Sequence, residues 1–245
     1  MKRQIVLTDD GSNSIFSEEV NQHYHSHFGA LQESMHIFIN AGLCSDTINH
    51  LETVSILEIG FGTGLNALLT CFKAQELHKK IYYEALELYP LTLQEAEQLN
   101  YPSLLPYSNG KEIFTALHNA EWNTEEKISE TFILHKRHIS AINANYTPDR
   151  FNLVYFDAFS PEVQPELWTK EVFTPIYNSM ENDSILLTYC TKGSIKQTLT
   201  ALGFHIEKLP GPVGKREILR AKKYYQKNDV SSSFHTNITS YFDFL

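Results

Sequence analysis

The sequence predicts an α/β fold built on a mostly parallel sheet, and two observations support this prediction. From Val54 onward, segments with strand character alternate with segments with helical character, which is typical of a parallel sheet with helices on both faces. Residues 204–221 are two extended runs joined by a Pro-Gly-Pro-Val-Gly turn, so the sheet is expected to end in an antiparallel hairpin. The residues before this alternation are expected to form an extension of their own.

The extension is predicted to hold a β-hairpin followed by a helix. Residues 3–17 (RQIVLTDDGSNSIFS) have two short extended runs around an Asp-Asp-Gly-Ser turn. Residues 30–43 (ALQESMHIFINAGL) place apolar side chains near helical spacing, and Gly42 is expected to end the helix. The predicted parts are an N-terminal extension (1–50) packed on the main domain, a main domain (51–223) and a C-terminal tail (224–245).

Apolar runs in the main domain predict its strands, and the segments between them predict its helices. Strands are expected at 54–60, 81–89, 132–138, 151–159 and 184–190, and in the two halves of the final hairpin. Helices are expected at 65–77 and 91–100. A chain of 245 residues that is 42% hydrophobic is large enough to bury a substantial core as one domain.

Charge and composition limit the class of protein. The formal net charge of -9 argues against broad, nonspecific attraction to nucleic acid, although basic clusters at 135–138 and 214–223 leave room for a local basic site. Solvated faces that keep the protein soluble are an equally good interpretation of these clusters. The start of the chain does not resemble a signal peptide, and no apolar run reaches the roughly 18 residues of a membrane span. We therefore expect a cytoplasmic protein that does not bind membranes.

No metal site is predicted. The cysteines lack a CxxC pair and are expected to be small buried hydrophobes; they are Cys44, Cys71 and Cys190. Three alternating histidines share one face of an extended segment but have no acidic or cysteine partner close in sequence; they are His23, His25 and His27. Packing of polar side chains is the interpretation that we prefer for these histidines.

The stretch LEIGFGTGLN, residues 57–66, predicts a ligand-binding turn between a strand and a helix. Its glycines are spaced GxGxG, whereas a dinucleotide-binding turn reads GxGxxG, which lowers the expectation of NAD or FAD. Glycines at the end of a first strand let the backbone pass close to a ligand, and the helix that follows points free N–H groups into the same crevice. The candidate cofactor-binding residues here are Glu58, Gly60, Phe61, Gly62, Gly64 and Asn66. A simple tight turn is the alternative.

A second acidic residue lies where such folds place a ribose. Glu87 stands at the end of the second main-domain strand, where its carboxylate can accept hydrogen bonds from both ribose hydroxyls, and Leu88 follows it. Glu84 lies on the same strand but farther from its end at Pro90, so Glu87 is preferred. No GK[ST] follows the glycines, which argues against a phosphate cradle. A nucleoside without pyrophosphate is therefore predicted, and S-adenosylmethionine fits that description.

Five strings together resemble one family. They are YHSHFGALQES, LEIGFGTGLN, FDAFSP, LWTKEVF and GKREILRA, and they occur in order over about residues 5–221. They closely resemble the methyltransferase domain of the MnmC family and its stand-alone form MnmD, which act on the wobble uridine of tRNA. The resemblance implies a class I methyltransferase (Rossmann-like) fold with a seven-stranded, mostly parallel sheet and S-adenosylmethionine as cofactor.

The resemblance also implies a reaction. It is methylation of the aminomethyl nitrogen of 5-aminomethyl-2-thiouridine in tRNA, which gives 5-methylaminomethyl-2-thiouridine. In two-domain relatives a flavin oxidase domain follows, and 245 residues are too few to include it. We therefore expect a chain that only methylates, with a separate oxidase or pathway as the source of the aminomethyl base.

Asp157 is the predicted catalytic residue and is also expected to lie at the cofactor. It ends an apolar strand, in the string FDAFSP, at the edge of the sheet where ligands of α/β proteins gather. The layout resembles the Asp-Pro-Pro-Tyr loop of amino-group methyltransferases. An alkylamine with a pKa near that of lysine, about 10.4, is protonated at neutral pH and must lose a proton before it attacks a methyl group. A carboxylate can take that proton and stabilise the charge that develops on nitrogen; capping of the following turn is the alternative role.

The predicted substrate contacts come from three segments. They are Tyr24, His25, Phe159, Ser160, Pro161, Lys215 and Arg216. Phe159 is expected to stack on the target base, and the two basic residues are expected to contact phosphate or substrate; ordinary packing and solvated charge are the alternatives. One departure concerns adenine: many class I methyltransferases carry an acid after the third strand, and His138 stands near that position here.

Three other functions remain open from the sequence. A methyltransferase for a small-molecule amine agrees with the acidic net charge. A polyamine-forming aminopropyltransferase would share the fold but is expected to have a more acidic glycine turn. A catalytically silent RNA-binding module is disfavoured by the presence of Asp157, Glu87 and the GxGxG turn.

Overall fold

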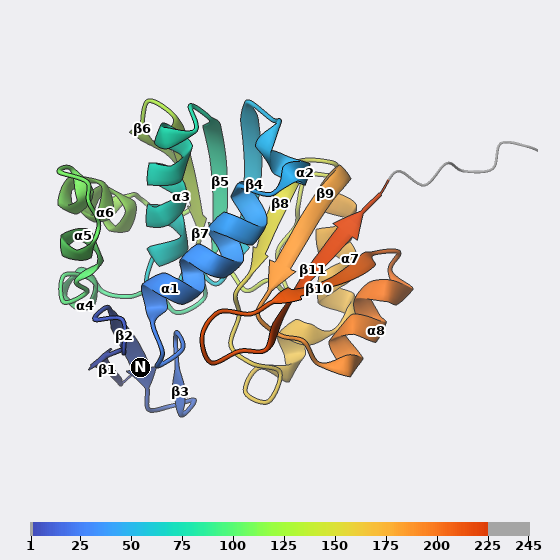
Figure 1. Ribbon diagram of the computed structural model, residues 1–245, viewed down its shortest axis with the longest axis horizontal. Helices are drawn as coiled ribbons and strands as arrows, with labels where there is room; N and C mark the ends of the chain where they lie inside the picture. The colour runs from blue at the N-terminus through green and yellow to red at the C-terminus, as the bar shows by residue number, and fades with distance from the viewer. Residues whose placement is uncertain (1, 225–245) are drawn as a thin grey trace, which may run out of the picture.

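The computed structural model describes residues 2–224 as a central sheet with helices on both faces and a small second sheet (Figure 1). The predicted tail, apart from its first residue, lies outside the described residues. Strands in chain order are β1 (Arg3–Leu7), β2 (Asn13–Ser17), β3 (Gln22–His23), β4 (Thr53–Ile59), β5 (Lys80–Leu86), β6 (Glu125–Ser129), β7 (Phe132–Arg137), β8 (Phe151–Phe156), β9 (Met180–Thr188), β10 (His205–Pro210) and β11 (Glu217–Lys223). Helices are α1 (Ala30–Ser34), the π-helix η1 (Met35–Leu43), α2 (Asp46–Asn49), α3 (Leu65–Glu76), α4 (Leu93–Ala96), α5 (Tyr101–Leu104), α6 (Gly110–Asn119), the 3-10 helix η2 (Pro165–Trp168), α7 (Lys170–Ser179) and α8 (Gly193–Ala201).

The main sheet confirms the predicted topology. Its strand order is β10-β11-β9-β8-β4-β5-β7-β6, with parallel pairing from β9 through β7. The final hairpin, β10 and β11, is antiparallel as predicted, and β11 also pairs antiparallel with β9. The central strands are buried on both faces, which is why they read as nearly continuous apolar runs.

The sheet has eight strands rather than the predicted seven. The additional strand, β6, pairs antiparallel with β7 at the sheet edge. Its sequence, Glu-Glu-Lys-Ile-Ser, is mostly polar and none of it is buried, so it carries no apolar alternation from which a strand is predicted. Helix α6 was not predicted either.

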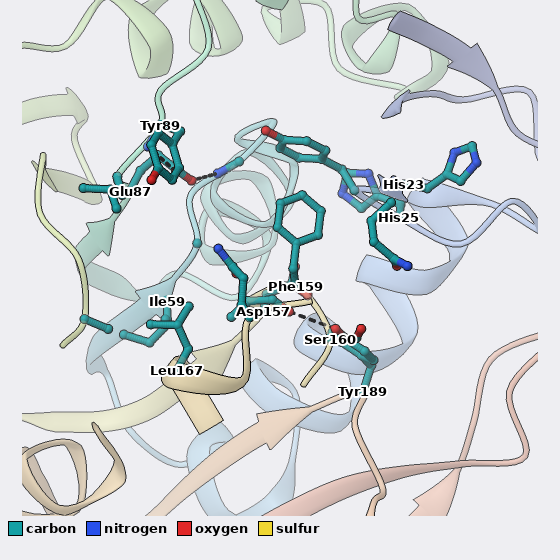
Figure 2. A pocket seen from close by; sticks show the side chains of 18 of the residues that line it. His23, His25, Ile59, Glu87, Tyr89, Asp157, Phe159, Ser160, Leu167 and Tyr189 are labelled. Atoms are coloured by element: carbon teal, nitrogen blue, oxygen red, sulfur yellow. Dashed lines mark hydrogen bonds between the residues drawn. The ribbon is translucent and has the colours of Figure 1, made fainter. Parts of the chain in front are cut away.

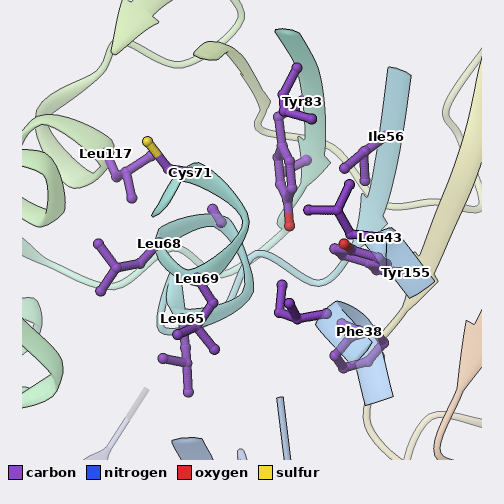
Figure 3. Close-up of a cluster of buried hydrophobic side chains, with 14 of the residues drawn as sticks. Phe38, Leu43, Ile56, Leu65, Leu68, Leu69, Cys71, Tyr83, Leu117 and Tyr155 are labelled. Carbon is purple, nitrogen blue, oxygen red and sulfur yellow. The ribbon is translucent and has the colours of Figure 1, made fainter. Parts of the chain in front are cut away.

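Two hydrophobic cores cover the two faces of the sheet. Figure 3 shows part of the first, in which Ile56 and Tyr155 meet Phe38 of η1 and leucines of α3. The second lies on the opposite face, where Leu57 and its neighbours pack against α7 and α8. Because successive side chains of a strand point to opposite faces, Ile56 and Leu57 enter different cores. Both cores therefore hold the central strands, and hence their carboxyl ends, in fixed positions.

The N-terminal hairpin and helix are confirmed, with two differences. β3 adds a short third strand to the hairpin. The helix over 30–43 changes from α to π geometry at Met35, and Gly42 lies inside it, one residue before its end. A Cβ atom at Gly42 would lie 2.6 Å from a methyl carbon of Leu187 on β9, so this glycine permits close packing rather than a left-handed stop. The division of the chain into domains stays a prediction.

The single helix predicted over 91–100 is wrong. The structure has only α4 there, with a capping box between Thr92 and Glu95. Asn100 then accepts a hydrogen bond from Asn13 N–H at 2.7 Å and donates one to Gly11 O at 2.8 Å. These bonds tie the segment to the N-terminal hairpin, and a new turn, α5, begins instead of a longer helix. Within residues 2–224, no helix is both long enough and apolar enough to cross a membrane.

Candidate functional site

A cavity of about 390 Å³ opens at the carboxyl ends of the parallel strands (Figure 2). Loops after β4, β5, β7 and β8 form its floor and two walls, and residues 21–27 of the extension form another wall. The last wall includes Tyr189, after β9, and Lys215, between β10 and β11. The volume lies within the range of small-molecule and cofactor sites, about 300–1,000 Å³.

The glycine turn is folded tightly against its neighbours. The N–H groups of Gly60 and Phe61 donate to Leu86 O at 3.0 and 3.1 Å. Gly60 has a φ of 93°, and a Cβ atom there would lie 2.9 Å from Asp157 O. Only glycine adopts this backbone without strain while leaving room for the adjacent loop. The turn therefore presents bare backbone to the cavity beside Asp157.

The Glu87 carboxylate is held by backbone N–H groups at the cavity wall. Oε2 accepts a hydrogen bond from Gly62 N–H at 3.0 Å, and Oε1 accepts one from Tyr89 N–H at 2.8 Å. Glu84, by contrast, does not line the cavity and pairs with Arg137 at 2.8 Å. The geometry thus separates the two acids that the sequence left in competition and places Glu87, followed by Leu88, at the cavity.

Asp157, Asn66 and Glu58 form a polar cluster at the base of the cavity. Asn66 Nδ2 donates to Asp157 Oδ2 and to Glu58 Oε1, each at 2.9 Å. Burial raises the pKa of Glu58 well above its usual value, which favours its neutral form. Among the described residues, Glu58 Oε2 and Asn66 Oδ1 have no hydrogen-bond partner. The Asp157 side chain lines the cavity, and Figure 2 shows it beside Phe159.

The environment of Asp157 favours proton uptake near neutral pH. Burial raises the pKa of its carboxyl to about 7, and the negative charge of Glu33 also raises it. The hydrogen bond from Asn66 and the charge of Lys215 act in the opposite direction. A carboxyl that titrates near neutral pH is well matched to accepting and returning a proton.

Five of the seven predicted substrate residues line the cavity, and two do not. Those in the lining are Tyr24, His25, Phe159, Ser160 and Lys215. Tyr24 and Phe159 meet edge to face with ring centroids 5.0 Å apart. Pro161 and the exposed Arg216 are absent from the lining.

His25 faces the glycine turn as well as the cavity. Its backbone N–H donates to Ser14 Oγ at 3.2 Å, and its ring Nε2 lies 3.5 Å from Thr63 Oγ1. Burial lowers the pKa of His25 to about 4, so the ring is neutral at pH 7. This uncharged ring joins the extension to the turn.

Some of the predicted cofactor residues line the cavity, and others lie behind the residues that line it. Gly60, Gly62, Glu87, Leu88 and Asp157 line it, and Phe61 and Asn66 line a small adjoining hollow. Glu58 is fully buried beneath Asn66, so it positions that side chain rather than facing the cavity. Gly64 caps the amino end of α3 with a left-handed φ of 72° and does not reach either surface.

Sequence reasoning missed two residues of this site. Glu33, in α1, and Tyr189, after β9, both line the cavity. Glu33 belongs to the string YHSHFGALQES. A charged residue within an otherwise apolar helical segment could have indicated a site residue. Tyr189 follows a predicted strand at the same sheet edge as Asp157, so the rule that located Asp157 also applied to it.

The loop after β7 approaches the cavity without an acidic side chain. His138 Nε2 lies 3.1 Å from Leu88 O, and Ile139, Ser140 and Ala141 line the cavity. Cys71 and Cys190 are buried and Cys44 is half-buried. Over residues 2–224, no group of three or more His, Cys, Asp or Glu side chains is arranged to hold a metal ion.

These features fit a nucleoside-bearing sulfonium cofactor. Gly60 and Gly62 leave a cradle that Cβ atoms would fill, and a Cβ at Gly62 would lie 3.3 Å from Tyr24. Glu87 supplies acceptors for ribose hydroxyls. The Asp157 carboxyl, which lines the cavity, supplies a further acceptor. The volume and the donor set agree with the size and polarity of S-adenosylmethionine.

Comparisons with known proteins agree with this site. Residues 115–224 match a family described as S-adenosyl-L-methionine-dependent methyltransferase. The bifunctional tRNA 5-methylaminomethyl-2-thiouridine biosynthesis protein MnmC of Burkholderia thailandensis is 26% identical over 229 residues, which are 88% of this chain and 34% of the relative. MnmC of Actinobacillus pleuropneumoniae is 25% identical over 251 residues, 93% of this chain and 36% of the relative. The chain thus spans 34–36% of the length of these two relatives.

A solved structure shares the fold. MnmC2 from Aquifex aeolicus matches with a TM-score of 0.73 and 23% identity, over 93% of this chain and 73% of that chain. The match confirms the class I methyltransferase architecture, with a mainly parallel sheet, an antiparallel hairpin and an additional N-terminal sheet. The chain is thus similar to S-adenosyl-L-methionine-dependent methyltransferases over residues 115–224, to the MnmC proteins over most of its length, and to MnmC2 in its fold.

Proposed function

We propose that this protein methylates the aminomethyl nitrogen of 5-aminomethyl-2-thiouridine at the wobble position of tRNA, giving 5-methylaminomethyl-2-thiouridine. The observation that carries the proposal is the Asp157 carboxyl, which lies in a cavity also lined by the glycine turn and Glu87 and whose Oδ2 is held by Asn66. The MnmC relatives, which are named for biosynthesis of this nucleoside, support the choice of substrate. The cellular site proposed for the reaction is the cytoplasm.

The proposed cofactor contacts divide by chemistry. Glu87 accepts hydrogen bonds from ribose hydroxyls, while Gly60 and Gly62 let the backbone approach the cofactor closely. Leu88 and the loop after β7 supply a mainly apolar wall for adenine. S-adenosylmethionine, when bound, supplies a methyl group on a positively charged sulfur that is readily transferred to a nucleophile.

Asp157 prepares the amine for reaction. Its carboxylate accepts a proton from the substrate ammonium at Oδ1, which frees the nitrogen lone pair. Asn66 holds Oδ2 at 2.9 Å, so the carboxyl stays oriented while the proton moves. Once this carboxyl has released the proton to solvent, its negative charge stabilises the positive charge that the nitrogen gains with the methyl group. Asp157 thus acts both as a base and as an electrostatic anchor.

The aromatic pair Tyr24 and Phe159 is proposed to hold the uridine ring. Their edge-to-face contact leaves an aromatic wall beside Asp157, suited to stacking on an unpaired base. His25 and Ser160 complete the polar side of this subsite. Arg216, which is exposed, is proposed to contact a tRNA phosphate.

The source of the aminomethyl base is proposed to be a separate oxidase or pathway. A small-molecule amine is the alternative substrate, because the same acidic cavity recognises any compact alkylamine. To distinguish the two, we would compare bulk tRNA nucleosides from cells with and without this protein by mass spectrometry. The proposal predicts loss of 5-methylaminomethyl-2-thiouridine and accumulation of its aminomethyl precursor; an unchanged nucleoside profile would favour the small amine.

A further inference from the structure

An ion pair between a buried glutamate and a partly exposed lysine lines the cavity that also contains Asp157. Glu33, from α1, is 7% exposed, and its Oε1 contacts Lys215 Nζ from the loop between β10 and β11. Glu33 Oε2 accepts a hydrogen bond from Ser26 N–H at 2.8 Å. Both members of the pair line the cavity, although the proposed chemistry at Asp157 does not yet use them.

Lys215 is also held from the side of the Asp157 loop. Its Nζ lies 4.2 Å from the centroid of the Tyr189 ring, which attracts the ammonium group. The Tyr189 hydroxyl donates to Ala158 O at 2.9 Å, directly after Asp157 (Figure 2). The ion pair, Tyr189 and the Asp157 loop therefore form one connected wall, so the charges are fixed relative to the reacting group.

Some of the ionisable groups near Asp157 are charged, and others favour their neutral forms. The groups whose charges are coupled to that of Asp157 are Glu33, Lys215, Glu58, Tyr83 and Tyr189. Burial raises the pKa values of Glu58 and of both tyrosines, so these three favour their neutral forms. Glu33 offsets Lys215, so the ionised Asp157 carboxylate leaves one negative charge in this wall for an ammonium group, apart from the Glu87 carboxylate that also lines the cavity.

We propose that the Glu33–Lys215 pair is a specificity-determining element of the transferase cavity that selects a cationic primary alkylamine and rejects anionic substituents at the same nitrogen. Glu33 neutralises Lys215, so the lysine does not attract a substrate carboxylate. Glu33 also keeps the surroundings of Asp157 negative, which favours transfer of the ammonium proton to that carboxyl. This inference rests on the proposed function and deepens it.

The test uses two substitutions with opposite charge effects. Glu33→Gln keeps an acceptor for Ser26 and removes a negative charge, so Asp157 ionises at lower pH. Lys215→Met keeps an apolar stem against Tyr189 and removes a positive charge, so Asp157 ionises at higher pH. Because the pKa of Asp157 is about 7, we expect the acid limb of the kcat/KM profile near pH 7 in the native enzyme and its displacement by about one pH unit in opposite directions in the two variants.

The kinetic constants add a second readout. Glu33→Gln is expected to raise KM for amine-bearing tRNA by about tenfold and to change kcat by less than about threefold at pH 8, because it weakens recognition of the cation. The matched control is Glu130→Gln, which removes the same charge from an exposed pair with Lys127 and should leave both constants unchanged. Calorimetric binding of S-adenosylmethionine should be unaltered in all variants.

The outcomes separate this inference from the function on which it rests. Acid limbs that move in the same direction, or not at all, would show a merely structural pair and overturn the inference. If native protein transfers no methyl group to tRNA, the proposed function fails. The Asp157 carboxyl is then titrated by carbon-13 NMR in the same variants. Opposite shifts would keep the pair as an element that selects some other cationic amine, and absent shifts would reject it.

Discussion

Replacing Asp157 by Asn is expected to lower kcat for methyl transfer by about 10²–10³-fold, while S-adenosylmethionine still binds. Asn has the same shape and keeps an oxygen for Asn66 Nδ2, which donates to Asp157 Oδ2 at 2.9 Å. It takes no proton, however, and carries no negative charge beside the developing ammonium. Single-turnover rates at saturating cofactor, with calorimetric cofactor affinity, measure the two effects separately.

The same substitution is also expected to change how the Tm depends on pH, and a measured Tm shows that the variant is folded. Folding raises the pKa of Asp157 from 3.8 to about 7, so its contribution to stability is complete below about pH 4 and is lost as pH rises through 7. Asn does not titrate, and the Tm of the variant should therefore exceed that of the native protein by more at pH 8 than at pH 5. Asp183→Asn is the matched control, because Asp183 is exposed and its φ of 56° suits Asn. Native kcat in Asp157→Asn would contradict the role of Asp157 as a base.

Replacing Glu87 by Gln is expected to raise the Kd for S-adenosylmethionine by at least about 100-fold. The carboxylate accepts from Gly62 N–H at 3.0 Å and from Tyr89 N–H at 2.8 Å. Gln turns an NH₂ group toward one of these donors, which distorts the glycine turn, and it also loses a charged acceptor for the ribose. Calorimetric titration with S-adenosylmethionine measures the change.

The control for Glu87 lies on the same strand. Glu84→Gln makes the same chemical change at a residue that does not line the cavity. Glu84 pairs with Arg137, and the nitrogen–oxygen distance is 2.8 Å. We expect a lower Tm, because a nearly buried ion pair is broken, with cofactor affinity unchanged. If Glu84→Gln weakens cofactor binding as much as Glu87→Gln does, the assignment of Glu87 to the ribose is wrong.

The fold was predictable where apolar periodicity is strong. Buried strands such as β4 and β8 read as apolar runs because both of their faces are covered. Edge strand β6 was not predicted because its side chains are mostly polar and form no apolar run. The prediction of a helix over 91–100 was wrong for a different reason. Asn100 forms hydrogen bonds with the N-terminal hairpin, and local helix propensity does not depend on a partner some 87 residues away in the sequence.

The site was predictable where a motif coincides with the end of a strand. The glycine turn, Glu87 and Asp157 all follow that rule, and the structure brings them to one cavity. The Glu33–Lys215 pair does not, because its members come from the extension and the final hairpin, 182 residues apart. Lys215 was expected to contact phosphate or substrate, and the structure places it in the cavity lining, where it is paired with Glu33. Such pairing depends on tertiary packing and leaves no local pattern.

The most direct test of the central claim is methyl transfer in vitro to tRNA that carries 5-aminomethyl-2-thiouridine. Purified protein, labelled S-adenosylmethionine and this tRNA are incubated, and the nucleosides are analysed by mass spectrometry. The account predicts that label appears in 5-methylaminomethyl-2-thiouridine and that tRNA lacking the aminomethyl group gains none. Absence of label from that nucleoside, in a preparation that binds S-adenosylmethionine normally, would contradict the account.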